Sequence, residues 1–124
     1  MKTLTEKIMA TKSPWNNPYQ GPDKKVLFVC SAGILRSATG ARMYAHKYNT
    51  RAAGSEDYAL IPVSNDLIVW ADEIVFVNKE NFDTVNRKFD LSDVMNKVVV
   101  LDIPDQFPHM DPELQKAFKA QYRG

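Results

Sequence analysis

The sequence contains a single cysteine, Cys30, and this scarcity limits the chemistry open to the chain. One thiol cannot form an internal disulfide, so the chain fits a reducing compartment. Histidine is also scarce: His46 and His109 are far apart in the sequence and belong to no ligand motif. We therefore expect no metal site and no cofactor.

Long apolar runs are missing as well. No stretch approaches the ~18 apolar residues that a membrane span needs, and the N-terminus has no apolar signal region. We therefore expect no membrane partner and a cytoplasmic location. With 124 residues, of which 44% are hydrophobic and 25% charged, the chain has the composition of one globular domain with a core of its own.

Acidic residues are absent between Lys24 and Ser55, a stretch that holds six lysines and arginines. From Glu56 onward, thirteen acidic residues outnumber seven basic ones. A basic stretch favours anionic substrates. Its basic residues are few and are not interleaved with aromatic ones, which argues against a nucleic-acid partner. The oligomeric state does not follow from the sequence.

Apolar runs alternate with helical patterns along most of the chain. Residues 1–24 hold three of the seven prolines and are predicted to form a Pro-rich N-terminal extension that lies on an α/β domain formed by residues 25–124. Strands are expected over 25–30, shortly before Gly54, over 73–77 and over 97–101. Helices are expected over 36–49, from Pro62 to Trp70, over 79–88, and after Asp111 as cap and Pro112 as first residue.

Continuous apolar strands separated by helices predict a parallel sheet covered on both faces. The expected fold is a three-layer α/β/α domain with a central parallel sheet of about four strands. Ligands of such sheets bind beyond the carboxyl ends of the strands. Cys30, Asp102 and Asp105 each follow the end of an expected strand, so the fold can bring them to one edge.

The segment from Cys30 to Ser37 combines a nucleophile, a loop of small and apolar residues, and a fixed cation. A thiolate is the nucleophilic form of cysteine, and a helix N-terminus beside an arginine favours it. The hydroxyl of Ser37 can donate a further hydrogen bond to the sulfur. The planar fork of Arg36 matches two phosphate oxygens. The alternative is a buried strand-end cysteine followed by a solvated arginine; the added serine and the preceding apolar strand favour a phosphate-binding loop.

The pattern Val29-Cys30-x5-Arg36-Ser37 resembles the phosphate-binding loop of low-molecular-weight protein tyrosine phosphatases. The segment from Leu101 to Phe107, with an aspartate close to a proline and an aromatic residue, resembles the general-acid loop of that family. The chain is similar to a compact bacterial and phage branch labelled "predicted protein tyrosine phosphatase". The resemblance covers residues 25–120.

This resemblance implies a cysteine-dependent phosphatase that hydrolyses phosphomonoesters, above all protein phosphotyrosine, through a cysteinyl-phosphate. Its substrate would be a phosphorylated protein or a small phosphomonoester. Cys30 would be the nucleophile, Arg36 the phosphate ligand and Asp105 the general acid, with Asp102 as the alternative acid. The implied phosphate-binding residues are Ser31, Ala32, Gly33, Ile34, Leu35, Arg36 and Ser37. Phe107 and Tyr58 are candidate walls for a substrate ring, or ordinary packing residues.

The loop departs from the family pattern at Ala32-Gly33, where relatives carry Gly-Asn and the asparagine braces the loop. Gln106 replaces the proline that follows the acid. These departures leave a non-catalytic phosphoprotein-binding module as one alternative. A second is an arsenate reductase that uses an external thiol, since the chain lacks the further cysteines of a disulfide relay. A third is a phosphatase for phosphoserine or for a nucleotide-linked phosphate.

Overall fold

The computed structural model describes residues 23–122. The predicted extension over residues 1–24 therefore lies outside the described residues, apart from its last two. The strands are β1 (Lys25–Cys30), β2 (Asn49–Gly54), β3 (Glu73–Phe76) and β4 (Val98–Val100). The helices are α2 (Arg36–Met43), α3 (Asn65–Trp70), α4 (Lys79–Phe89), the 3-10 helix η1 (Leu91–Lys97) and α5 (Pro112–Gln121).

The four strands form one sheet in the order β2-β1-β3-β4, and every neighbouring pair is parallel. The strands β1 and β3 are central, and their apolar side chains are buried on both faces, as continuous apolar runs predict. Cys30 pairs with Gly54 at the carboxyl end of β1. The expected parallel sheet of about four strands is confirmed.

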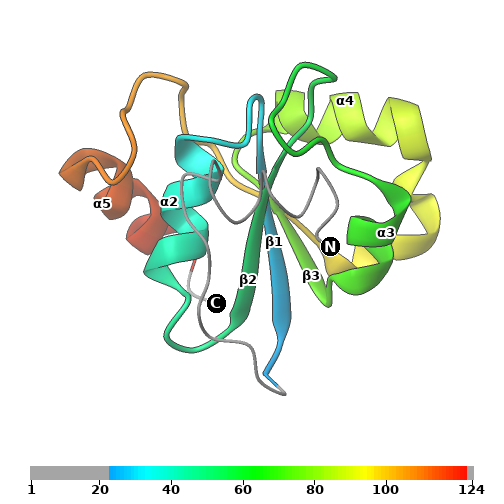
Figure 1. Cartoon of the computed structure of the whole chain (residues 1–124), viewed down its shortest axis with the longest axis horizontal. Coiled ribbons are helices and arrows are strands. Elements are labelled where there is room, and N and C mark those ends of the chain that lie inside the picture. Colours follow the sequence, from blue (N-terminus) through cyan, green and yellow to red (C-terminus); the bar gives the residue numbers. More distant parts are fainter. Residues whose placement is uncertain (1–22, 123–124) are drawn as a thin grey trace, which may run out of the picture.

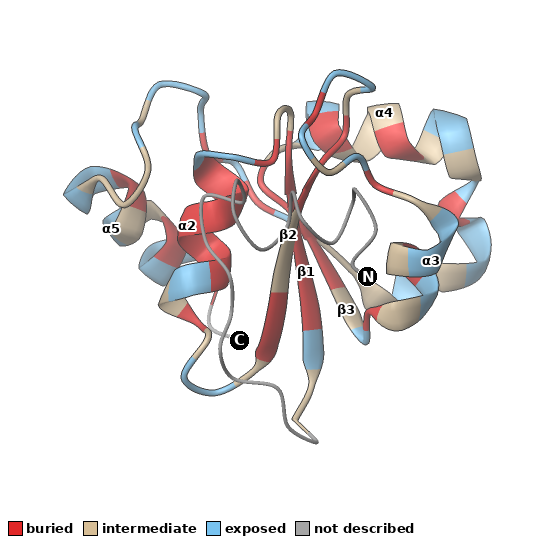
Figure 2. Ribbon diagram, in the orientation of Figure 1, coloured by how far each residue is buried: buried red, intermediate tan, exposed pale blue. Residues whose placement is uncertain are grey.

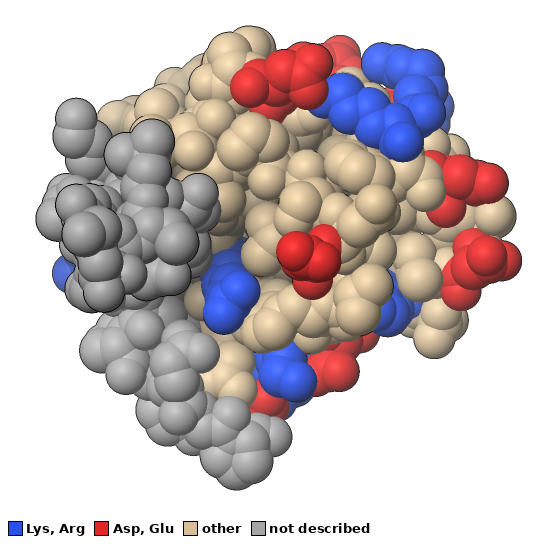
Figure 3. Space-filling view, turned by 45° about the vertical axis from the view of Figure 1, so that its right-hand side comes forward, with Lys and Arg blue, Asp and Glu red and all other residues tan. Residues whose placement is uncertain are grey.

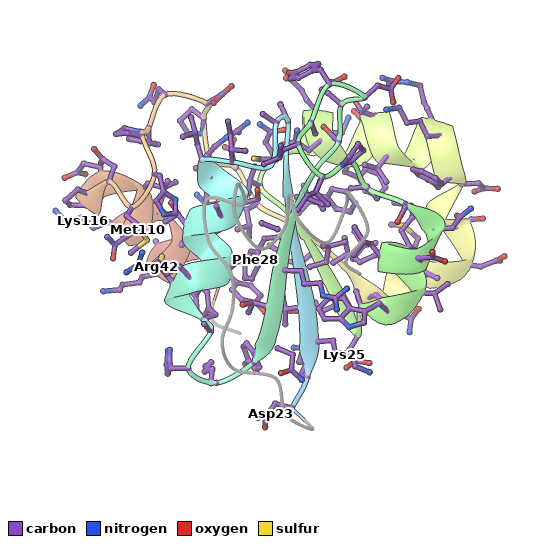
Figure 4. All side chains as sticks on the ribbon, in the orientation of Figure 1. Asp23, Lys25, Phe28, Arg42, Met110 and Lys116 are labelled. Atoms are coloured by element: carbon purple, nitrogen blue, oxygen red, sulfur yellow. The ribbon has the colours of Figure 1, made fainter. Side chains whose placement is uncertain are left out.

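Helices cover both faces of the sheet, with α2 and α5 on one side and α3 and α4 on the other (Figure 1). Side chains of β1 alternate between the two cores: Phe28 packs with α2 and α5, and Leu27 packs with α3 and α4. Figure 4 labels Phe28 on the α2 side of the sheet, and Figure 2 shows that most residues of β1 and β3 are buried. The predicted three-layer architecture is confirmed.

The helix predicted over 36–49 is shorter than expected and ends at Met43. The hydroxyl of Thr50 donates to the carbonyl oxygen of Ala41, at 2.8 Å, and so satisfies a carbonyl that the helix leaves free. The ring of Tyr44 stacks on Phe28 with centroids 5.9 Å apart, and tighter turns lead from there into β2. The prediction of a short strand before Gly54 is confirmed by β2.

The helix predicted from Pro62 begins instead at Asn65, with the Ser64 hydroxyl accepting from the Leu67 N–H. Pro62 forms a parallel bridge with Gly54, because the segment around it continues beside the end of β2. The remaining expected helices are confirmed: α4 spans Lys79–Phe89, and α5 begins at Pro112 with Asp111 as its cap. The 3-10 helix η1 was not expected.

Three of the basic side chains between Lys24 and Ser55 are engaged within the described structure. Lys24 pairs with Glu73 at 3.1 Å, Arg51 lies 4.4 Å from the ring centroid of Trp70, and Arg36 is buried. On the face seen in Figure 3, acidic and basic side chains are interspersed. Within residues 23–122, no helix has both the length and the apolar character to cross a bilayer.

Candidate active site

Cys30 lies at the carboxyl end of β1, where its side chain is 3% exposed. Its sulfur accepts a hydrogen bond from the Gly33 N–H at 3.2 Å. The Ser37 hydroxyl lies 3.1 Å from the sulfur: the thiol donates to it, and the same hydroxyl can donate to a thiolate. One group of the following loop and one of the first turn of α2 thus hold the sulfur.

The loop between Cys30 and α2 packs directly on the end of β2. Gly33 has a φ of +77°, and a Cβ there would lie 2.7 Å from the carbonyl carbon of Ala53. A Cβ on Gly54 would lie 2.6 Å from the Ser31 carbonyl oxygen. Glycine at both positions therefore allows two backbone segments to touch, which gives the loop a rigid base.

The helix α2 begins at Arg36, and its N-cap residue, Leu35, supplies no side-chain capping bond. The first N–H groups of a helix lack partners within it and favour an anion. Arg36 is 1% exposed and donates from Nη1 to the Ile103 carbonyl oxygen at 2.9 Å. Its buried Nε has no hydrogen-bond partner. A guanidinium nitrogen without a hydrogen bond, beside a helix N-terminus, suits a phosphate oxygen.

A cavity of about 110 Å³ lies over the sulfur and is lined by the Cys30–Arg36 loop, Tyr58 and Asp105. The Asp105 Oδ1 lies 3.6 Å from the Arg36 Nε, and the carboxylate side chain is 64% exposed. A second cavity of about 350 Å³ adjoins it through Asp105 and is also lined by Asp102. Of the two candidate acids, only Asp105 borders the cavity that contains the sulfur.

The two aromatic candidates differ in their surroundings. Tyr58 is 73% exposed and borders the cavity over Cys30, together with Ile34 and Leu35. Phe107 is half-buried against the core between the sheet, α2 and α5, and it does not line that cavity. Ordinary packing, the alternative that the sequence left open, is what the structure shows for Phe107.

The segment that carries Asp105 is attached to α2 at both ends. Arg36 holds the Ile103 carbonyl, and the Thr39 hydroxyl accepts from the Met110 N–H at 2.7 Å while donating to the Leu35 carbonyl at 2.9 Å. Figure 4 shows Met110 beside α2. His109 Nδ1 lies 3.4 Å from the same hydroxyl, and burial lowers the pKa of this histidine. Thr39 thus links the segment that carries Asp105 to the loop that follows Cys30.

Two solved structures share this arrangement of elements. A tyrosine phosphatase of Erwinia amylovora, AmsI, is 23% identical, with 86% of this chain and 89% of that chain aligned at a TM-score of 0.57. A low-molecular-weight protein tyrosine phosphatase of Campylobacter jejuni is 17% identical, with 79% and 88% aligned at a TM-score of 0.52. The chain has the fold of the low-molecular-weight protein tyrosine phosphatases. No protein-family model and no curated protein sequence matches it.

Within this low-molecular-weight phosphatase fold, sequence reasoning missed two buried polar residues, Thr39 and Asn81. Asn81 lies in the first turn of α4 and donates from Nδ2 to the hydroxyls of Ser31, at 3.2 Å, and Ser55, at 3.1 Å. One signal was available in the sequence, since the pattern Asn78-x-x-Asn81 directly follows the strand expected over 73–77. The carboxyl end of that strand, β3, lies beside the carboxyl end of β1. Within residues 23–122, no group of three or more His, Cys, Asp or Glu side chains forms a metal cluster.

Proposed function

We propose that this protein is a cysteine-dependent phosphatase that hydrolyses phosphomonoesters, with protein phosphotyrosine as its main substrate class. The observation that carries the proposal is the convergence of the Cys30 sulfur, the Arg36 guanidinium and the Asp105 carboxylate on one cavity of about 110 Å³. A nucleophile, a phosphate-binding cation and a proton donor are the three groups that phosphomonoester cleavage through a covalent intermediate requires. The fold shared with two tyrosine phosphatases supports the same reading.

In the first step the Cys30 thiolate attacks phosphorus, and an S–P bond forms as the bond to the leaving oxygen breaks. Protonated Asp105 gives its proton to that oxygen. In the second step Asp105, now a carboxylate, takes a proton from water as the water oxygen attacks phosphorus. The S–P bond breaks, and inorganic phosphate and the thiolate are released.

The negative charge of the transferring group is balanced by Arg36 and by the N–H groups of the loop and of the first turn of α2. The Ser37 hydroxyl, 3.1 Å from the sulfur, donates to the thiolate when it is the leaving group of the second step. A reducing compartment such as the cytoplasm would keep the lone thiol in its reactive form.

An aromatic substrate is favoured by the rim of the cavity. Tyr58, Ile34 and Leu35 are exposed apolar side chains at its opening. An aryl ring gains contact area there, whereas a sugar or a nucleotide would leave hydroxyl groups against apolar surface. This contact supports phosphotyrosine over phosphoserine and over nucleotide-linked phosphates.

The test is hydrolysis of p-nitrophenyl phosphate, measured from about pH 5 to pH 8 with wild-type and Cys30→Ser proteins side by side. We expect turnover that is lost in Cys30→Ser while inorganic phosphate still binds, because the variant keeps Arg36 and the loop N–H groups. A folded wild-type protein that binds phosphopeptide without turnover would favour the binding module. Arsenate-dependent oxidation of an added thiol, without ester hydrolysis, would favour the reductase.

A further inference from the structure

A single buried amide joins three segments at the edge of the cavity. Asn81 is 2% exposed, and its Nδ2 donates both to Ser31, the residue after the nucleophile, and to Ser55, at the start of the segment that carries Tyr58. In Figure 1, α4 begins beside the loop that follows β1. Side chains from three separate elements therefore meet at Asn81.

Backbone hydrogen bonds connect the same two segments. The Ser55 N–H donates to the Cys30 carbonyl at 2.7 Å, and the Glu56 N–H donates to the Ser31 carbonyl at 3.2 Å. Ser31 is thus held through its carbonyl on one side and through its hydroxyl on the other. With both contacts in place, the peptide units that flank Ser31 have little freedom to rotate.

The Oδ1 of Asn81 is buried and has no hydrogen-bond partner. An unpaired buried carbonyl is unfavourable, and an apolar side chain of similar size would avoid its cost. Stability alone therefore does not explain an amide at this position. The hydrogen bonds from Nδ2 to the two serines are the interaction that only the amide supplies.

We infer that Asn81 is a positioning residue of the proposed phosphate-binding loop over residues 30–37, called the phosphate loop below. It holds Ser31 so that the loop N–H groups point at the anion before substrate arrives. This inference rests on the proposed function, because it gives Asn81 a part in binding the transferred phosphate. Donors fixed in advance cost no reorganisation when the ligand binds. Asn81 acts through Ser31 and has no direct role in the reaction.

The experiment measures the Kd of inorganic phosphate by calorimetry and kcat/KM for p-nitrophenyl phosphate. Asn81→Leu is expected to weaken phosphate binding about tenfold, the value of one misaligned charge-assisted hydrogen bond, and to lower kcat/KM by about 10- to 100-fold. The matched control is Asn86→Leu on the same helix, which removes a 2.8 Å hydrogen bond to the Leu91 N–H away from the cavity. The control is expected to bind phosphate as the wild type does.

Ser31→Ala removes the same hydrogen bond from the loop side and keeps the test decisive if Asn81→Leu does not fold. It is expected to weaken phosphate binding to a similar degree, and adding Asn81→Leu to it should cause little further loss. The inference is overturned if Asn81→Leu, or Ser31→Ala in its place, keeps the phosphate Kd within twofold of wild type. The inference is also overturned if Asn81→Leu weakens phosphate binding equally in the wild-type protein and in the Ser31→Ala variant.

The two proposals fail in different ways. A wild-type protein that binds phosphate but hydrolyses no ester refutes the proposed phosphatase, while the phosphate Kd of the variants still decides the role of Asn81. A wild-type protein that binds no phosphate refutes both.

Discussion

Replacing Gly33 with alanine tests whether the phosphate loop depends on close contact with β2. Gly33 has a φ of +77°, a backbone conformation that L side chains rarely adopt. A Cβ there would lie 2.7 Å from the carbonyl carbon of Ala53 and 2.8 Å from the nitrogen of Gly54. Ordinary contacts begin at 3.4 Å, so the loop or the strand must move by about 0.7 Å.

The strand cannot readily give way. Gly54 is held on its far side by two backbone hydrogen bonds of 2.9 Å, one from its own N–H and one to its carbonyl. The loop must therefore move, and the Gly33 N–H moves away from the Cys30 sulfur. The left-handed backbone costs an alanine about 1–2 kcal/mol, and overpacking adds about 1–3 kcal/mol. We expect a loss of about 2–5 kcal/mol in the free energy of unfolding.

Urea unfolding gives that free energy, and calorimetry gives the Kd of inorganic phosphate for the folded variant. We expect phosphate affinity and kcat/KM to fall by about 10- to 100-fold, because the loop is displaced by a large fraction of an ångström. Gly40→Ala is the matched control: its Cβ would lie 2.6 Å from the Phe28 ring and 2.9 Å from the Phe118 ring, in the core away from the cavity. It should lower stability and spare phosphate affinity. A Gly33→Ala protein with wild-type stability and phosphate affinity would refute this reasoning.

Asp105→Asn is expected to lower turnover of an aryl phosphate by about 10²–10⁴-fold, and Asp102→Asn by less; a larger loss from Asp102→Asn would reverse the assignment. Thr39→Val removes the acceptor of the Met110 N–H and should lower the free energy of unfolding in urea by about 1–3 kcal/mol. It should also lower kcat, and an unchanged kcat would show that the segment carrying Asp105 does not need this attachment. Burial lowers the pKa of His109, so the imidazole binds a proton less readily in the folded protein than in the unfolded chain. Stability should therefore fall as pH drops below about 6.5, and His109→Gln should flatten that dependence; equal slopes in urea titrations at pH 5 to 7.5 would contradict it.

The sheet could be predicted from the sequence because its strands are buried on both faces. Continuous apolar runs at residues 26–30 and 74–77 are unusual outside a covered parallel sheet, and they define the two central strands. The start of α5 could also be predicted from the sequence, because Asp111 followed by Pro112 is a local capping signal. These features depend on residues that are neighbours in the sequence.

The end of α2 was not predictable in the same way. Residues 44–48 have a helical pattern, but Tyr44 stacks on Phe28 and donates its hydroxyl to the Tyr122 carbonyl at 2.8 Å. Those partners lie on β1 and at the end of α5. Pro62 is a similar case, because its position in a helix or beside β2 depends on Gly54. Long-range contacts override the local preference at both places.

The loop departure at Ala32-Gly33 has a physical counterpart in the structure. Gly33 lies where relatives carry asparagine. The glycine lets the loop backbone touch the backbone at the end of β2, but it offers no side chain that could brace the loop. An amide from another element, Asn81 of α4, lies against Ser31 instead. The sequence showed that no asparagine lies at position 33, but only the packing of α4 against the loop shows that the Asn81 amide contacts it at Ser31.

Arg36 connects the two halves of the candidate site. One nitrogen of its guanidinium donates to the Ile103 carbonyl and so holds the segment that carries Asp105. Nε has no hydrogen bond and forms an ion pair with the Asp105 carboxylate at 3.6 Å. A lysine has a single nitrogen and could not bind phosphate and hold that carbonyl in the same geometry. In the proposed mechanism, phosphate binding and the position of Asp105 both depend on this one planar side chain, which would account for a buried arginine despite the cost of its desolvation.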